Sequence, residues 1–324
     1  MNLKILFVGY RDKRHTNVGG YDRIIGYPLS TSLLGSQVPF GFIPVGQRGK
    51  FINLFFLNQY AKWKRLNYDI VHFFCGEMIT NYKKIKDKKV VATIHMRVDE
   101  NNTKKIGRLK KLDGVVALSS AQTTFLKSKG VNAVFIPHGF SKPIFEHKNI
   151  NVDSNKINVV IIGTNYRDSS AILQAIDFCL KERQDVFFHL VGQTSSMKEK
   201  LLRYANARCY SRLDDDCYFS LIEKCDYNFL PLTFATANNT LLEAEFLGVK
   251  SILPKIDGVL DYAAPNPLNY FYDSIEDLKS LFLKVEKSQL SQELIEYSQK
   301  FEWKNIYSQL QSFYESLFTN KETD

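Results

Sequence analysis

Residues 234–248, FATANNTLLEAEFLG, place polar side chains at the start of a predicted helix and one carboxylate inside it. Asn238, Asn239 or Thr240 can cap the free backbone N–H groups of the first turn. Those N–H groups and the helix dipole can also hold a phosphate, and the small residues just before them let a ligand approach the backbone. Glu243 would repel a diphosphate, but it can accept hydrogen bonds from sugar hydroxyls. The alternative is a capped structural helix with an exposed glutamate, and these residues alone favour neither interpretation.

The elements that must position these residues alternate between apolar strands and helices. Strands are predicted at LKILFVGY, DIVHFFC, KVVATIH, GVVALS and AVFIPHG before residue 150, and at INVVIIGT, VFFHLVG, YNFLPL and VKSILPK after it. Helices are predicted at 119–129, 169–183, 215–225 and 239–247, with a last amphipathic helix in WKNIYSQLQSFYESLF. This pattern predicts an α/β protein with two Rossmann-like, doubly wound domains and a polar linker near 141–156. Ligands bind at the carboxyl ends of such strands, so two domains facing each other would form a cleft there.

Composition excludes several classes of protein. The chain has 324 residues, of which 44% are hydrophobic, and no window approaches 18 consecutive apolar residues, so no membrane span is expected. The start, MNLKILFVGYRDKR, is too short for a secretory signal and is typical of a buried first strand. The five cysteines are odd in number and form no CxxC pair, and the histidines show no HExxH spacing. We therefore expect reduced thiols in a cytoplasmic protein, without a disulfide framework or a zinc site.

Charge is distributed unequally along the chain. Residues 1–148 contain 25 Lys and Arg against 9 Asp and Glu, whereas the remainder contains 18 against 25, for a total of +9. A basic half joined to an acidic half indicates domains with different partners. Anionic lipid and nucleic acid are the candidates for the basic half, but no zinc-finger, RNP-like or basic-zipper pattern is present, so nucleic acid is not expected.

The stretch GKFINLFFLNQYAKWKRL (49–66) mixes aromatic and basic residues. A helix of this composition can lie in a membrane interface, and the positive charge of the first half favours contact with anionic lipid. A core helix with a solvated basic end is the equal alternative. The basic runs 83–89 and 104–111 are expected to form solvated faces.

Ordered motifs along nearly the whole chain resemble those of the GT-B glycosyltransferases, specifically the retaining GT4-type family. The segment NNTLLEAEFLGVKSILP resembles the donor-binding motif of that family. The others, in chain order, are NVGGYDR (17–23), TIH (93–95), FIPHGF (135–140), VVIIGTNYRD (159–168) and FEW (301–303). The resemblance implies an acceptor-binding domain at 1–148 and a donor-binding domain at 149–303, with a helix at about 304–320 that packs back on the first domain.

The resemblance also implies roles for individual residues. Glu243 would bind the ribose hydroxyls of the nucleotide, and Arg167 would bind the diphosphate, to which its guanidinium is suited because it can contact phosphate oxygens in a bidentate way. His95 would lie near the reacting sugar. The glycine loops of the donor site would contain Gly19, Gly20 and Gly163. Its diphosphate cradle would consist of Asn238, Asn239 and Thr240, and its base pocket would contain Arg212 and Leu213. Alternatives are a hydrogen-bonded core histidine at 95, a plain turn at 19–20 and a surface cation at 167.

Two departures from the family pattern bear on activity. The family usually has a second glutamate eight positions before the ribose-binding one, where it holds the transferred sugar, and this chain has Ala235 there. The loop after Gly163 has Asp168 in place of a clear second lysine. A catalytically degenerate protein that binds a glycan or a partner is therefore the competing hypothesis, and a different GT-B enzyme such as a nucleotide-sugar epimerase is a weaker one.

The function that the resemblance implies is retaining transfer of a sugar from a UDP- or GDP-sugar to a glycan or lipid-linked acceptor in bacterial surface polysaccharide assembly. Neither a metal nor a cofactor is expected, because the nucleotide sugar is itself the co-substrate. Asp214, Asp215 and Asp216 form no DxD-type metal motif and are expected to cap a helix. The expected location is cytoplasmic, with peripheral contact to the cytoplasmic face of the membrane.

Overall fold

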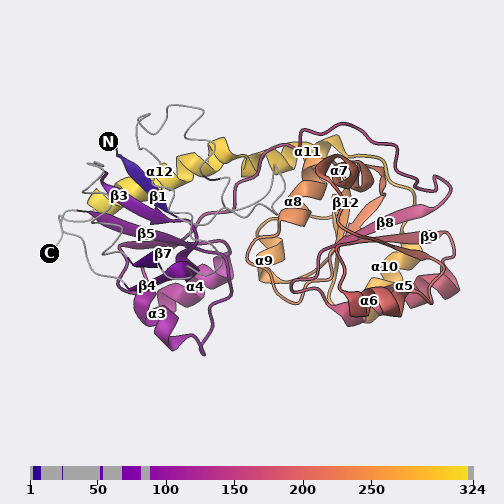
Figure 1. Cartoon of the computed structure of the whole chain (residues 1–324), viewed down its shortest axis with the longest axis horizontal. Helices are drawn as coiled ribbons and strands as arrows, with labels where there is room; N and C mark the ends of the chain where they lie inside the picture. The colour runs from indigo at the N-terminus through magenta and orange to yellow at the C-terminus, as the bar shows by residue number, and fades with distance from the viewer. Residues whose placement is uncertain (1–2, 9–23, 25–51, 54–67, 82–87, 320–324) are drawn as a thin grey trace. The chain divides into compact units, whose positions relative to one another are not determined.

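The structure, a computed structural model, describes residues 3–8, 24, 52–53, 68–81 and 88–319. The chain divides into two compact units (Figure 1). Unit 1 contains the described residues up to Ser141 and those from Phe301 onward, and unit 2 contains residues 142–300.

Unit 1 is built on a parallel sheet with the strand order β1-β3-β5-β6-β7. Its strands are buried apolar runs, as expected for parallel strands covered on both faces. They are β1 (Ile5–Val8), β3 (Ile70–Phe73), β5 (Lys89–Ile94), β6 (Gly114–Ala117) and β7 (Ala133–Phe135). The helices are α3 (Thr103–Leu109), α4 (Ser120–Ser128) and α12 (Trp303–Thr319), with a 3-10 turn, η2, at Gly76–Met78.

The last helix, α12, packs on the sheet of unit 1 although it follows unit 2 in the chain. The Oη of Tyr314 on α12 is 2.5 Å from Nδ1 of His72 on β3, and Nε2 of His72 is 2.8 Å from Oγ1 of Thr93 on β5. Burial lowers the pKa of His72 to about 3, with a smaller effect from His95, so the imidazole is neutral. Gly114 on β6 leaves room for Phe313 of α12, because a Cβ there would lie 2.5 Å from its ring.

Unit 2 contains a six-stranded parallel sheet with the order β10-β9-β8-β11-β12-β13. The strands are β8 (Ile157–Ile162), β9 (Val186–Val191), β10 (Ala207–Tyr210), β11 (Tyr227–Phe229), β12 (Lys250–Pro254) and β13 (Tyr270–Tyr272). The helices are α5 (Ser169–Glu182), α6 (Ser195–Leu201), α7 (Asp215–Lys224), α8 (Asn239–Phe246), α9 (Asp257–Leu260), α10 (Ile275–Lys284) and α11 (Gln292–Ser298), followed by the 3-10 turn η3 (Gln299–Phe301).

The helices of unit 2 cover both faces of its sheet (Figure 1). Apolar side chains of α5, α6 and α10 pack on one face, where they meet Val159, Phe188, Phe229 and Ile252. Helices α7 and α8 lie on the opposite face, and α11 packs on α8. The predicted helices at 119–129, 169–183, 215–225 and 239–247 are confirmed to within a residue or two at each end.

The structure differs from the predicted helix at 49–66 near the start of that stretch. Ile52–Asn53 is the short strand β2, which pairs with β4 (Ile79–Asn81), so a helix beginning at residue 49 is wrong at these two positions. The rest of that stretch, 54–66, lies outside the described residues. Within the part of the chain that the structure describes, no helix is long and apolar enough to cross a membrane.

A candidate nucleotide site at the carboxyl edge of unit 2

The strand order of unit 2 fixes where a ligand is most readily bound. From β8 the chain moves outward through β9 to β10, then returns to the other side of β8 with β11 and continues to β13. The order therefore reverses between the neighbouring strands β8 and β11. In doubly wound folds, ligands bind beyond the carboxyl ends of the strands at such a switch point. The loop after β8 and the loop and helix after β11 contain six of the predicted site residues: Gly163, Arg167, Asn238, Asn239, Thr240 and Glu243.

The loop after β8 is held in place by its own arginine. Gly163 has a φ of +76°, which favours glycine, and its N–H donates to the carbonyl of Val191. Arg167 donates from Nε to the carbonyl of Ile162 at 3.0 Å and from Nη1 to the carbonyl of Asn165 at 3.1 Å. Nη2 makes no hydrogen bond to any described residue and lies 3.8 Å from the point that a Cβ on Gly163 would occupy. The guanidinium thus shapes the loop and keeps donors for a ligand.

The loops after β8 and β11 are joined by their backbones. Arg167 and Leu232 form an antiparallel bridge, the N–H of Asp168 donates to the carbonyl of Pro231, and the N–H of Thr233 donates to the carbonyl of Tyr166. These bonds bring Arg167 to the segment that leads into α8. The loop that contains Arg167 is therefore bonded to residues 231–233, which directly precede the 234–243 stretch.

Helix α8 begins as its sequence indicates. Asn238 is the N-cap, and its Oδ1 accepts a hydrogen bond from the N–H of Leu241 at 3.2 Å. Asn239 and Thr240 open the first turn behind it. The N-terminus of α8 and the Gly163 loop follow adjacent strands, and each offers a group that suits a phosphate: the free N–H groups of the helix and the positive charge of Arg167.

Glu243 is buried, with 4% of its surface exposed, so an exposed glutamate on α8 is wrong. Its Oε2 accepts a 2.5 Å hydrogen bond from the phenol of Tyr218 on α7. Burial raises the pKa of Tyr218 well above its ordinary value, and Glu243 raises it further, so the phenol is a neutral donor. Arg167, Tyr218 and Glu243 form one electrostatic cluster, which joins three loops or helices of this edge.

Arg167 is a cation that is largely removed from water. Burial lowers its pKa to about 10, and the nearby Tyr218 and Glu243 offset part of that effect. A pKa of about 10 still leaves the guanidinium charged at neutral pH. A bound anion would restore interactions that Arg167 loses on burial, and this favours an anionic ligand at this position.

Arg212 and Leu213 lie after β10, two strands away from β8. Arg212 is exposed and forms no hydrogen bond or ion pair with any described residue. Asp214 caps α7 by accepting from the N–H of Cys217, and Asp215 and Asp216 occupy the first turn, as predicted for this acidic run. Among the described residues, no hydrogen bond or ion pair joins Arg212 or Leu213 to the Arg167 cluster.

His95 belongs to unit 1 and is half-buried at the end of β5. Its Nε2 donates to the carbonyl of Phe74 at 2.6 Å, which places the ring proton on that nitrogen, and its backbone N–H donates to Glu77. Its ring lies 6.1 Å from that of His138, and both rings line a small cavity of about 20 Å³ with Trp303. Gly19 and Gly20 lie outside the described residues.

Ala235, which replaces a family glutamate, is buried at 7% exposure. Gly258 at the start of α9 packs directly on its backbone, because a Cβ on Gly258 would lie 1.9 Å from the carbonyl oxygen of Ala235. The loop between β11 and α8 is therefore restrained by its contact with α9.

Sequence reasoning missed Tyr218. Its partner Glu243 is 25 residues away, and no local pattern marks the contact. The available signal was an aromatic residue one turn inside a helix that begins with three aspartates. Among the described residues, no group of three or more His, Cys, Asp or Glu side chains could hold a metal ion.

Comparison with protein families and with curated proteins gave no match. Solved structures, in contrast, match nearly the whole chain. Anabaena HepE in complex with UDP-glucose is 14% identical with a TM-score of 0.69, over 97% of this chain and 100% of HepE. The lipopolysaccharide outer core galactosyltransferase WaaB is 14% identical with the same TM-score, over 97% of this chain and 99% of WaaB. The chain has the GT-B fold.

Larger proteins with this fold match over a shorter share of their length. The pneumococcal O-GlcNAc transferase GtfA, solved with UDP and GlcNAc, is 13% identical with a TM-score of 0.62, over 82% of this chain. The chain spans 60% of the length of GtfA and 60% of that of S. aureus TarM. At these identities the likeness establishes the fold, and the activity has to be argued from the site.

Proposed function

We propose that the protein is a glycosyltransferase that moves a sugar from a UDP- or GDP-sugar to a glycan or lipid-linked acceptor. The observation that carries this proposal is the meeting of Arg167, the Gly163 turn and the capped N-terminus of α8 at the switch point of the unit 2 sheet. The names of several structures with the same fold support a diphosphate nucleotide, because HepE and GtfA were solved with UDP or UDP-glucose.

The chemistry follows from the charge that develops as the sugar leaves. Breaking the bond between sugar and diphosphate puts negative charge on the diphosphate. In this proposal the free donors of Arg167 and the N–H groups at Asn239 and Thr240 would stabilise that charge, and one preorganised donor of this kind is worth about 3–4 kcal/mol in the transition state. Glu243, held by Tyr218, would accept hydrogen bonds from the ribose.

The remaining roles are assigned by position. Gly163 would let the diphosphate approach the backbone, and Arg212 and Leu213 would contact the base. His95, with Gly19 and Gly20, would contact the transferred sugar from the acceptor-binding half, 1–148, while 149–303 binds the donor. We propose a GT4-type, retaining, metal-independent hexosyl transfer with no cofactor.

The cellular setting proposed is bacterial surface polysaccharide assembly at the cytoplasmic face of the membrane. WaaB, which has the same fold at full length, is named for a lipopolysaccharide reaction, and this supports a lipid-linked acceptor. The basic first half of the chain supports peripheral contact with anionic lipid.

A second candidate function is glycan or partner binding by a degenerate enzyme. Ala235 favours it, because a buried methyl group stands where the family places a carboxylate that holds the transferred sugar. The two candidates differ in whether nucleotide is released from a nucleotide sugar.

The test is release of nucleotide from a panel of UDP- and GDP-sugars, with and without EDTA. Wild type should release either UDP or GDP from one of these sugars, and Arg167→Gln should lower kcat at least 100-fold. Arg203→Gln should match wild type, because Arg203 is an exposed arginine remote from the carboxyl edge. Proton NMR of the product's anomeric centre tests retention. Failure of a folded sample to release nucleotide from any sugar would favour the degenerate candidate.

A further inference from the structure

A second cavity lies at the opposite edge of the unit 2 sheet. It has a volume of about 440 Å³, within the range of small-molecule sites. Its walls include Leu180 and Gln184 at the end of α5, Phe187 near the start of β9, and Arg208 near the start of β10. These positions belong to the amino ends of the strands, whereas Arg167 and α8 follow the carboxyl ends. The cavity is therefore separate from the candidate nucleotide site.

The cavity exists because polar side chains occupy one face of β8, β9 and β10. Parallel strands are normally apolar on both faces, and here the face opposite the apolar core presents Asn158, His189 and Arg208. The linker from unit 1 follows α7, where the backbone N–H groups of Glu146 and Lys148 donate to Asp216 and Ser220. It then closes one side of the cavity with Asn151, Asp153 and Lys156.

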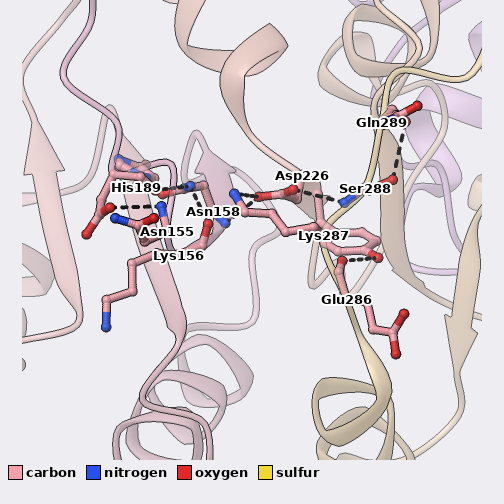
Figure 2. A network of polar contacts seen from close by, with 11 residues as sticks. Asn155, Lys156, Asn158, His189, Asp226, Glu286, Lys287, Ser288 and Gln289 are labelled. Atoms are coloured by element: carbon pink, nitrogen blue, oxygen red, sulfur yellow. Dashed lines mark hydrogen bonds and ion pairs between the residues drawn. The ribbon is translucent and has the colours of Figure 1, made fainter.

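His189 lines the cavity, and its imidazole is held by neutral groups that lie behind it. The amide of Asn158 donates to the carbonyls of Asp153 and Lys156, and its Oδ1 accepts from Nε2 of His189 at 2.9 Å. Nδ1 of His189 is then the acceptor for the phenol of Tyr210. Figure 2 shows that this series of hydrogen bonds continues from the backbone N–H of Asn158 to the carboxylate of Asp226, which also accepts from the N–H of Ser288. Because both ring nitrogens are engaged, the imidazole is fixed in place and neutral.

The walls offer the groups that hold a polyol. The ring of Phe187 lies against that of His189, with 5.1 Å between centroids, and gives an apolar surface for the C–H groups of a sugar ring. Amides of Asn151, Gln184 and Asn206, the carboxylate of Asp153 and the guanidinium of Arg208 can donate to or accept from hydroxyls.

Charge favours a neutral ligand over an anion. Arg208 and the carboxylate of Asp153 both line this cavity, and the Nζ of Lys156 already donates to the carbonyl of Gln184 at 2.8 Å. A phosphate would gain from Arg208 but would face Asp153, whereas a hydroxyl can bind either group. We propose that this cavity is a second, non-catalytic site that binds one or two sugar rings of a neutral saccharide. The inference does not depend on the proposed donor site.

Binding of maltose, cellobiose and lactose, each at millimolar concentration, tests the proposal by saturation-transfer NMR and calorimetry on the full chain with UDP present. Ala205→Trp adds a side chain at the exposed rim and should weaken binding at least tenfold. Arg208→Gln should weaken it about fivefold. Arg203→Gln is the matched control, because Arg203 packs on Tyr204 as Arg208 packs on Tyr210 but does not line the cavity; it should bind as wild type does.

Three results would overturn the proposal: no disaccharide binds the folded protein, binding survives Ala205→Trp, or inorganic phosphate displaces the saccharide. Nucleotide affinity, measured on the same variants, should stay at the wild-type value. A loss of saccharide binding with normal nucleotide affinity therefore reports on this cavity alone, and a failure of nucleotide binding leaves the saccharide result interpretable.

Discussion

The two edges of the unit 2 sheet are built from different kinds of residue. At the carboxyl edge, charged groups meet: the cation Arg167 lies in one electrostatic cluster with Tyr218 and the buried carboxylate of Glu243. At the amino edge, the neutral imidazole of His189 and the amide of Asn158 form a closed hydrogen-bond chain. One sheet thus presents a cluster of charged groups at one end and a polar cavity beside a neutral hydrogen-bond network at the other.

The difference extends to how each edge is stabilised. Arg167 has free donors and a lowered pKa, so an anionic ligand would improve its environment. Asp226 at the amino edge is satisfied by the protein itself, through the backbone N–H groups of Asn158 and Ser288 and through Lys287. We therefore expect substitutions at the amino edge to affect stability and those at the carboxyl edge to affect ligand binding as well.

The largest effect is expected from Asp226→Ala. Asp226 is buried, and its loss would leave two backbone N–H groups without an acceptor, so the free energy of unfolding should fall by about 4 kcal/mol in urea titrations. Asp177→Ala is the control, because its ion pair with Lys181 is at the surface and should cost less than about 1 kcal/mol. A normal stability for Asp226→Ala would contradict this view of the amino edge.

Gly258→Ala should be the next largest. A Cβ would overlap the carbonyl oxygen of Ala235, so the loop into α8 must shift, and the free energy of unfolding should fall by about 3 kcal/mol. Gly107→Ala, in α3 with no atom within 4 Å of the new Cβ, should instead gain about 0.5–1 kcal/mol. Equal effects of the two substitutions on the thermal midpoint would show that the contact behind Ala235 is not tight.

The pH dependence should differ in sign for two buried groups. Burial lowers the pKa of His189 to about 4, so its contribution is complete above about pH 6.5 and is lost as the pH falls toward 4. Burial raises the pKa of Glu245 on α8 to about 7, so its contribution is complete below about pH 4.5 and is lost as the pH rises toward 7. Relative to wild type, Glu245→Gln should gain about 2 kcal/mol between pH 4.5 and 7.5, whereas His189→Gln should lose a similar amount.

Urea unfolding at several pH values measures both profiles. The free energy difference from wild type should rise with pH for Glu245→Gln and fall with pH for His189→Gln. If both differences move in the same direction, burial is not what sets these two protonation states.

A smaller effect is expected from removing one phenol from each of two hydrogen-bond networks, that of Glu243 and that of His189. Tyr218→Phe removes the donor to Glu243 and Tyr210→Phe removes the donor to His189, so each should cost about 1–2 kcal/mol in stability. Only Tyr218→Phe should also weaken nucleotide binding, by about tenfold, as measured by calorimetry. An equal loss of nucleotide affinity in Tyr210→Phe would remove the distinction between the two edges.

Most of the fold could be predicted from the sequence, because buried strands and capped helices leave local patterns. The N-cap at Asn238 and the start of α5 behind Asp168 are cases in which the side chain that ends the loop is itself the signal. The aspartates at 214–216 were correctly interpreted as a helix start for the same reason.

What the sequence could not provide depends on distant contacts. The Tyr218–Glu243 hydrogen bond requires α7 and α8 to pack on the same face of the sheet, and no spacing along the chain encodes that. The amino-edge cavity requires a linker to lie beside alternate residues of β9 and β10. The strand at Ile52–Asn53 was missed because a run of aromatic and apolar residues is compatible with either a helix or a strand.

The most direct test of the central claim is nucleotide binding at the carboxyl edge. We would measure thermal stabilisation of wild type, Arg167→Gln and Arg203→Gln by UDP, GDP, ADP and CMP. A nucleotide at a hundred times its Kd adds about 2.7 kcal/mol to the stability of the folded state. We predict that UDP or GDP stabilises wild type and Arg203→Gln and that Arg167→Gln loses most of this shift. Stabilisation of all three proteins to the same extent, or of none while they remain folded, would contradict a donor site built around Arg167.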